Sequence, residues 1–154
     1  MFTGIVQCTG RIAAVEPLGF GRRLAIEAPE LGLDDVRIGD SIAVNGACMT
    51  VTAKTGRGFS IDVSAESLSK TAGLDAMGEG NLEKAMRFGD RLDGHLVSGH
   101  VYGTGIVNTL QRHGESWLFI VDAPAGLGRY FAYKGSVAVQ GVSLTINRVE
   151  DVAP

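Results

Sequence analysis

The chain repeats itself at one fixed spacing, and this repeat limits its possible folds more than any other feature. The segment GIVQCTG begins at Gly4 and returns as GHVYGTG at Gly99, while NGACMTVT begins at Asn45 and returns as QGVSLTIN at Gln140. Both pairs are 95 positions apart (99 − 4 and 140 − 45), so they align without a gap. A shared offset at such widely spaced positions indicates two copies of one unit.

The repeat predicts two domains of unequal length. A period of 95 residues is too long for a solenoid, so each copy is expected to be a small domain. We predict an N-terminal domain over 1–94 and a C-terminal domain over 95–154, joined near the polar, glycine-rich Arg87–Gly94 segment. Nothing in the second copy corresponds to residues after Gly58–Phe59, and half a barrel would leave open strand edges. We therefore expect the natural chain to continue beyond Pro154.

The hydrophobic pattern predicts an all-β protein with little helix. Apolar residues alternate in short runs, and the 22 glycines are dispersed as in tight turns. Six short strands in fewer than about 100 residues favour a small closed barrel. The first-copy strands are expected at Gly4–Gln7, Arg11–Val15, Arg23–Glu27, Ser41–Val44, Met49–Thr52 and Gly58–Val63. The second-copy strands are expected at Gly105–Val107, Trp117–Val121, Ser136–Val139 and Leu144–Ile146, with short helices at Glu30–Leu33, Ala65–Thr71 and Ala125–Tyr130.

Composition and charge narrow the class of protein. The net charge of −3 gives no attraction to nucleic acid or to anionic membrane surfaces. No apolar run approaches the roughly 20 residues that span a bilayer, and the N-terminus lacks the pattern of a signal peptide. Cys8 and Cys48 have no metal-type spacing, so we expect reduced thiols in a cytoplasmic protein and no metal site.

Two pairs of small polar residues recur at the repeat spacing. Cys48 and Thr50 lie two positions apart on an expected strand, so their side chains share one face, and Ser143 and Thr145 repeat that arrangement. Such pairs suit ligand contacts, but they also suit buried residues whose hydroxyls bond nearby backbone. Spacing alone leaves both interpretations open.

Other candidate residues break or mark the symmetry between the copies. Gly4 and Gly99 indicate the close approach of a ligand, the close approach of another backbone, or a β-bulge. His100 replaces Ile5, and Lys134 replaces Gly39; a structural histidine and a surface lysine are the plainer interpretations. The Asp62–Ser67 segment offers two carboxylates and two hydroxyls, although Ser64 also suits a helix N-cap.

Several segments together resemble the riboflavin synthases of the alpha-chain type. They are Met1–Val6 (MFTGIV), Ser41–Thr52, Asn81–Ala85 (NLEKA), Gly94–Val101 (GHLVSGHV) and Gly141–Thr145. The resemblance implies two similar Greek-key barrels of six strands, a homotrimer with active sites between subunits, and no metal or organic cofactor. It implies that each barrel binds one 6,7-dimethyl-8-ribityllumazine, and that one lumazine transfers a four-carbon unit to the other. The products are riboflavin and 5-amino-6-ribitylaminouracil.

The resemblance also implies two pockets, each with its own residues. The first would comprise Gly4, Ile5, Val6, Ser41, Cys48, Met49 and Thr50, with Asp62, Val63, Ser64, Ala65, Glu66 and Ser67, whose carboxylates would hold ribityl hydroxyls. The second would comprise Gly99, His100, Val101, Ser143, Leu144 and Thr145, with Lys134 reaching a neighbouring subunit. Phe2 and His100 would lie near the reacting centre, with His100 as proton shuttle and Cys48, Ser143 or Thr145 assisting or holding a water.

Two alternatives to the synthase follow from the same residues. An antenna-type protein would bind lumazine or flavin without turnover, but such binders tend to lose the polar residues of the second pocket, which are present here. A chain that ended at Pro154 would bind lumazine in its first barrel without turnover. Tyr102 and Gln140 depart from the usual family residues and alter the expected second pocket.

Overall fold

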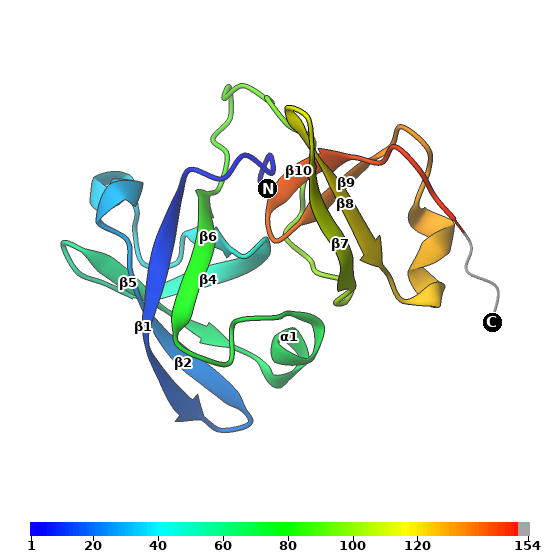
Figure 1. Ribbon diagram of the computed structural model, residues 1–154. Helices are drawn as coiled ribbons and strands as arrows, with labels where there is room; N and C mark the ends of the chain where they lie inside the picture. Colours follow the sequence, from blue (N-terminus) through cyan, green and yellow to red (C-terminus); the bar gives the residue numbers. More distant parts are fainter. Residues whose placement is uncertain (151–154) are drawn as a thin grey trace.

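The computed structural model describes residues 1–150 as an all-β protein in two unequal halves (Figure 1). The last four residues of the predicted second domain, 151–154, lie outside the described residues. The first half contains the strands β1 (Cys8–Leu18), β2 (Gly21–Glu27), β3 (Ser41–Val44), β4 (Ala47–Lys54), β5 (Gly58–Val63) and β6 (Gly78–Lys84). The second contains β7 (Ile106–His113), β8 (Ser116–Asp122), β9 (Ser136–Val139) and β10 (Val142–Thr145).

Helix is scarce, as the hydrophobic pattern predicts. The described chain has one α-helix, α1 (Ala65–Lys70), and the 3-10 turns η1 (Pro29–Leu31), η2 (Leu33–Asp35) and η3 (Ala125–Tyr130). Each lies at or overlaps one of the three predicted helical segments. No helix among residues 1–150 is long and apolar enough to cross a bilayer.

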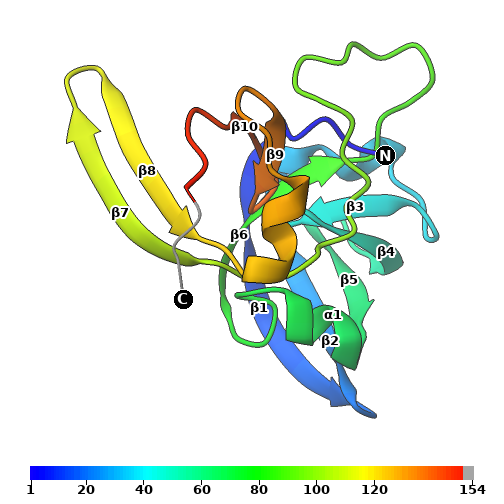
Figure 2. The same cartoon turned by 90° about the vertical axis from the view of Figure 1, so that its right-hand side faces the viewer.

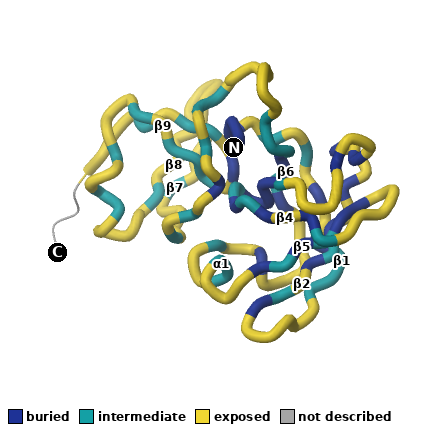
Figure 3. Tube along the Cα trace, turned by 180° about the vertical axis from the view of Figure 1, so that it is seen from behind, coloured by how far each residue is buried: buried dark blue, intermediate teal, exposed yellow. Residues whose placement is uncertain are grey.

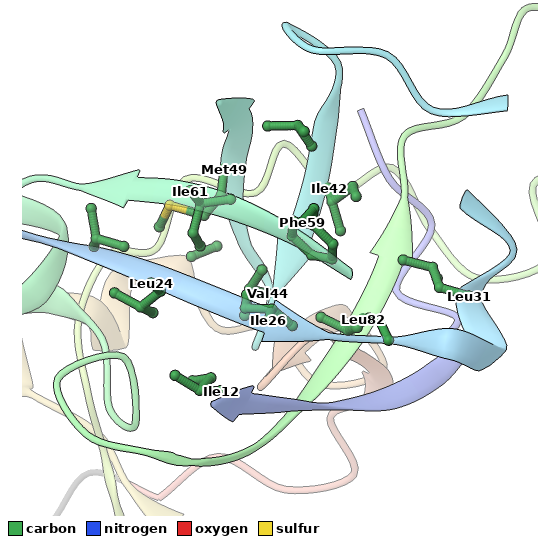
Figure 4. Packing of buried hydrophobic residues seen from close by; sticks show 14 of the residues in the cluster. Ile12, Leu24, Ile26, Leu31, Ile42, Val44, Met49, Phe59, Ile61 and Leu82 are labelled. Carbon is green, nitrogen blue, oxygen red and sulfur yellow. The ribbon is translucent and has the colours of Figure 1, made fainter. Parts of the chain in front are cut away.

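The first half is a closed antiparallel barrel in the order β1-β2-β5-β4-β3-β6. Alternating side chains point inward from every strand, and Leu24, Ile42 and Leu82 are fully buried at its centre (Figure 4). Closure pairs β1 with β6, so this barrel has no free sheet edge. The predicted barrel for the first copy is therefore confirmed.

The sixth strand of that barrel is not the predicted one. Gly4–Gln7 was expected to be a strand, but it forms none of the barrel, and Gly4 has a left-handed φ of 76°. The sixth strand is β6 (Gly78–Lys84), whose sequence GEGNLEK is too polar and glycine-rich to show the expected alternation. The sequence of β6 has a low intrinsic propensity for strands, so its pairing with β1 on one side and β3 on the other is what stabilises it.

The second half forms two separate hairpins, β7–β8 and β9–β10. In the first barrel, β5 joins β2 to β4, and β6 joins β1 to β3. Among the described residues 95–150 no strand joins the two hairpins in this way, and the β7–β8 hairpin projects away from the rest (Figure 2). Much of the backbone of this hairpin belongs to exposed residues (Figure 3). Its apolar side chains are among them, with Trp117 63% and Ile106 74% exposed. The described second half is an open set of hairpins, so a closed second barrel is not observed.

The repeat nevertheless extends to backbone detail. Asn45–Gly46 and Gln140–Gly141 turn their hairpins with matching positive φ values of 50° and 80°, and 49° and 80°. Such paired left-handed residues form the type I′ turn that suits a right-twisted hairpin. The Gly39 N–H donates to Val51, just as the Lys134 N–H donates to Ile146. The β3–β4 and β9–β10 hairpins are therefore alike in backbone detail as well as in sequence.

Each half begins with a lead segment, residues 1–7 before β1 and residues 95–105 before β7. Each lead segment crosses over to the other half. Phe2 and Val97 exchange two backbone hydrogen bonds of 2.8 and 3.0 Å, which places the two lead segments side by side. Beyond this bridge the Ser143 N–H donates to the Gly4 carbonyl at 2.7 Å, and the Cys48 N–H donates to the Gly99 carbonyl at 2.8 Å. At the repeat offset of 95, Gly4 corresponds to Gly99 and Cys48 corresponds to Ser143, so the two hydrogen bonds are equivalent. The halves are therefore related by a pseudo-two-fold axis.

Candidate functional site

A cavity of about 370 Å³ lies against the first barrel, between β4, α1 and the segment that leads into the second half. It is large enough for a small organic ligand. The lining residues are Ala47, Cys48, Met49, Glu66, Ser67, Lys70, Thr71, Gly99, His100 and Val101.

Strand alternation in β4 decides which side chains face the barrel core, although the core residue Met49 also borders the cavity. Met49 and Val51 point into the barrel core, whereas Cys48 and Thr50 lie on the outer face, as their spacing predicts. Cys48 lines the cavity, and its N–H donates to Gly99 on the opposite wall. The exposed Thr50 lies opposite Ser41 in the β3–β4 pair, and neither residue belongs to the cavity lining.

Helix α1 supplies the polar wall of the cavity. Ser64 caps this helix: its hydroxyl oxygen accepts the Ser67 N–H at 3.0 Å, which confirms the N-cap interpretation. The cap fixes the first turn, where Glu66 and Ser67 line the cavity together with Lys70. Ala65 and the buried Val63 complete the segment without lining the cavity.

The two carboxylates of the Asp62–Ser67 segment have different positions. Asp62 lies outside the cavity lining and accepts two hydrogen bonds from the Arg23 guanidinium, at 2.7 and 2.8 Å. The hydrogen bond to Arg23 holds the pKa of Asp62 below its usual range, against a smaller opposing effect of burial. Only Glu66 is therefore placed for a ligand in this cavity, whereas both carboxylates were expected there.

Each lead segment lies against the opposite half from the pocket to which the resemblance assigns its residues. Gly99, His100 and Val101 line the cavity of the first barrel, although the resemblance groups them with the second. Gly4 contacts the second half, because the Ser143 N–H donates a hydrogen bond to the Gly4 carbonyl. The cause is the crossover, a contact between distant segments that the repeat does not reveal.

The glycines of the lead segments are explained by backbone approach. Gly99 has a φ of 81°, and a Cβ there would lie 2.6 Å from the Cys48 Cβ. Gly4 has a φ of 76°, and a Cβ there would lie 2.8 Å from the Ser143 Cβ. Of the interpretations considered for these glycines, the structure therefore supports close contact with another backbone.

Phe2 is buried beneath the cavity instead of being part of its wall. Its side chain is 0% exposed. A Cβ on Gly99 would lie 2.9 Å from Cε2 of the Phe2 ring. Phe2 therefore anchors the crossover. Ile5 and Val6, by contrast, are exposed and half-buried, and neither lines the first cavity.

The predicted second-pocket residues lie on β9–β10 and its flanks. Ser143 and Leu144 are half-buried and Thr145 is exposed on β10. Lys134 occupies the left-handed turn position of Gly39, with φ of 63°, and its Nζ donates to Asn147 Oδ1 at 2.7 Å. The lysine is thus an exposed turn residue with a partner in its own chain.

Two residues close to these segments were missed by the sequence analysis as site residues. His95 Nδ1 lies 2.7 Å from Ser143 Oγ, and the His95 N–H donates to Thr3. Glu83 is 4% exposed and accepts hydrogen bonds from Thr3 N, Thr3 Oγ1 and Gly4 N at 2.6, 2.7 and 3.1 Å. Glu83 thereby fixes the first lead segment. Because Leu82 faces the barrel core, Glu83 lies on the outer face of β6, where the N-terminal segment buries it, and no pattern in the sequence indicates this.

Comparison with known proteins gives the relatives of this chain. A family model described as the lumazine binding domain matches residues 3–85 and 98–153. A riboflavin synthase of Photobacterium leiognathi is 43% identical over 97% of this chain and 69% of its own length. A riboflavin synthase of Bacillus subtilis is 40% identical over 95% of this chain and 68% of its own length.

Solved structures show the same fold. A crystal structure of LumP complexed with riboflavin matches with a TM-score of 0.86 at 25% identity, over 97% of this chain and 82% of that one. LumP complexed with 6,7-dimethyl-8-(1'-D-ribityl) lumazine matches with a TM-score of 0.84 at 25% identity, over 98% of this chain and 82% of that one.

Proposed function

The chain belongs to the lumazine-binding domain family, within it to the riboflavin synthases, and on that premise we propose that it dismutates 6,7-dimethyl-8-ribityllumazine. Two lumazine molecules would react to give riboflavin and 5-amino-6-ribitylaminouracil. One lumazine donates a four-carbon unit, and the other accepts it.

The observation that carries the proposal is the pairing of a ligand-sized cavity with a pseudo-two-fold repeat. The cavity of about 370 Å³ beside Cys48 is formed by one half of the molecule and the lead segment of the other. The repeat places Ser143 and the Gly4 segment in an equivalent arrangement. A reaction between two identical substrates needs two related half-sites, and holding the reactants face to face supplies much of the catalysis.

In the first half-site the chemistry of the wall suits a ribityllumazine. The carboxylate of Glu66 and the hydroxyl of Ser67 can hold ribityl hydroxyls, while backbone groups near Gly99 can meet the edge of the pteridine ring. His100 and Cys48 supply the groups nearest the expected ring position. The predicted contacts of Ser41, Thr50 and Asp62 with the ligand stay proposals that depend on a different arrangement of subunits.

The assembly and location of the protein are part of the proposal. A homotrimer would place the open second half of one subunit against the first barrel of another, which is supported by the exposed apolar residues of β7 and β8. A cytoplasmic location is supported by Cys8 and Cys48, which are both free thiols in the described chain.

A lumazine or flavin carrier is the second candidate, because the LumP structures share the fold and hold such ligands. Identity separates the two candidates: it is 40–43% to the two riboflavin synthases and 25% to LumP. His100, Ser143 and Thr145 are also present here. The synthase is therefore favoured.

The test is to incubate the purified chain, after its intact mass is checked, with the lumazine as sole substrate. We expect riboflavin and 5-amino-6-ribitylaminouracil in equal amounts, without added metal or cofactor. A perturbed lumazine spectrum without riboflavin would identify a carrier and contradict the synthase.

A further inference from the structure

A second cavity lies where a turn of the second half meets the outer face of the first barrel. Its volume is about 320 Å³, at the lower end of the range for small-molecule sites. The polar side chains that line it are Thr9, Asn45, Glu79, Asn81 and Gln140, and we call it the joint cavity. It shares no lining residue with the cavity beside Cys48, so it is separate from the site proposed for lumazine.

Asn45 brings a buried hydrogen-bond donor to the wall of the joint cavity. The residue is 9% exposed, and its Oδ1 accepts the Asn81 N–H at 2.9 Å, which identifies Nδ2 as the free end of the amide. Within residues 1–150 this NH2 group has no hydrogen-bond partner. Among those residues no side-chain nitrogen or oxygen is both sealed from solvent and unpaired, so Nδ2 opens into the cavity. Because buried donors are nearly always paired, this group calls for a ligand or a water.

Two glycines leave room beside that amide. Gly73, with a φ of 82°, and Gly80 both line the joint cavity. A Cβ on Gly73 would lie 3.4 Å from Asn45 Nδ2, and a Cβ on Gly80 would lie 3.5 Å from the same atom. Larger residues at these two positions would therefore fill the space in front of the donor.

The outer face of β1 and β6 forms the floor of the joint cavity. Glu79 and Asn81 lie two positions apart on β6 and so share this face, and Thr9 lies opposite Asn81. Arg11 lies opposite Glu79, but its guanidinium binds Glu27 at 2.8 Å. The Glu79 carboxylate therefore has no partner among the described residues and can accept hydrogen bonds from a ligand.

The second half closes the cavity with the turn between β9 and β10. Asn81 Nδ2 donates to the Gln140 carbonyl at 2.8 Å, which leaves Asn81 Oδ1 as an acceptor at the floor. The side-chain amide of Gln140 has no hydrogen-bond partner in the described part of the chain. The joint cavity thus combines donors, the NH2 groups of Asn45 and Gln140, with acceptors on Glu79 and Asn81.

This set of groups excludes several classes of ligand. No described lysine, arginine or histidine lines the cavity, and the Glu79 carboxylate repels anions such as phosphate. No described aromatic ring lines it either, so a planar ring system has no surface for stacking. A hydroxyl group both donates and accepts, and a carboxylate accepts from two neighbouring hydroxyls. Neutral donors beside acceptors therefore match a chain of adjacent hydroxyl groups.

We propose that the joint cavity binds a neutral polyol. Adjacent hydroxyls of the ligand donate to the Glu79 carboxylate and to Asn81 Oδ1, and they accept from Asn45 Nδ2 and from the Gln140 amide. This site is independent of the proposed reaction, because it uses none of the residues assigned to lumazine.

Proton–nitrogen correlation NMR of the intact chain tests the proposal. Ribitol and D-glucose are the polyol probes, titrated to about 100 mM because a ligand of roughly ten non-hydrogen atoms binds in the millimolar range. Sodium phosphate and methylammonium chloride probe the other classes. The readout is the backbone amides of Gly80 and Asn81 and the side-chain NH2 of Asn45.

Two variants and a matched control accompany the titration. Glu79→Gln removes the charge and keeps the shape, and Gln140→Gly removes the wall amide at a φ of 49° that suits glycine. Glu115→Gln, in the turn between β7 and β8, removes a carboxylate outside the cavity.

We expect saturable shifts at the joint cavity with ribitol or D-glucose. Glu79→Gln should raise the Kd about tenfold, because hydrogen bonds to a carboxylate are roughly twice as strong as those to an amide. Gln140→Gly should raise it about threefold, since a neutral hydrogen bond is lost. Glu115→Gln should bind like the unmodified chain.

Four results would overturn the proposal. The first is no saturable shift with either polyol, which means that the cavity holds water only. The second is a set of shifts confined to Thr71 and Gly99, which line the other cavity. The third is a stronger response to phosphate or methylammonium than to the polyols. The fourth is an unchanged Kd in Glu79→Gln whose spectrum shows a native fold.

Discussion

Replacing Glu83 by glutamine should destabilise the protein strongly, although the change adds no volume. The Glu83 carboxylate is 4% exposed and accepts three hydrogen bonds, two from Thr3 and one from Gly4. Glutamine keeps one acceptor oxygen, which can serve the two Thr3 donors. Its NH2 group then faces the Gly4 N–H, donor against donor.

The magnitude follows from those three bonds. Two hydrogen bonds lose their charge assistance at roughly 1 kcal/mol each, and the third is lost with a cost of roughly 1.5 kcal/mol. The sum is about 3.5 kcal/mol. For a chain of this size each kcal/mol lowers the melting temperature by about 2–4 °C. We therefore expect a drop of roughly 7–14 °C.

Urea unfolding measures this effect with a control on the same strand. Glu79→Gln, on the exposed part of β6, should change the free energy of unfolding by less than about 0.5 kcal/mol. Glu83→Gln should lower the midpoint with an unchanged m-value, and Thr3 and Gly4 should lose amide protection first. A loss below about 1 kcal/mol would refute the argument that this carboxylate holds the lead segment.

Three further changes test other parts of the account. Because its arginine partner lowers the folded pKa of Asp62, the ion pair stabilises the fold above the usual carboxyl pKa and this stabilisation is lost as the pH falls through the lower folded value. Asp62→Asn should thus cost up to about 1 kcal/mol at pH 7 and progressively less below about pH 4, as measured by urea unfolding. Gly99→Ala should cost roughly 3 kcal/mol through φ strain and the clash at 2.6 Å, whereas Gly89→Ala, with φ of 96° and open space, should cost only about 1 kcal/mol. Burial raises the pKa of the Cys8 thiol, so iodoacetamide should modify Cys48 faster than Cys8. Bound lumazine should protect Cys48 only, because Cys48 lines the cavity. Equal rates of modification, or protection of Cys8, would contradict the cavity assignment.

Local signals predicted much of this structure. The repeat of NGACMTVT as QGVSLTIN predicted that the two copies match, and the turns at Asn45–Gly46 and Gln140–Gly141 do match, because each copy carries its own turn residues. The Ser64 N-cap was also predicted, since capping depends only on neighbouring residues.

Features that depend on distant contacts could not be predicted in the same way. Strand β6 has a polar sequence and is stabilised by its two neighbours, so its pattern gave no strand signal. The crossover joins Gly4 to Ser143 and Gly99 to Cys48, and the alternation of side chains along a strand carries no information about such pairs. The partnership of His95 with Ser143, 48 residues away, was missed for the same reason.

A crystal structure of the protein with bound riboflavin would test the central claim most directly. The account predicts the isoalloxazine ring in the cavity between β4, α1 and Gly99–Val101, with Cys48 beside it and the ribityl chain near Glu66 and Ser67. Riboflavin bound elsewhere, with this cavity empty, would contradict the assignment of the site.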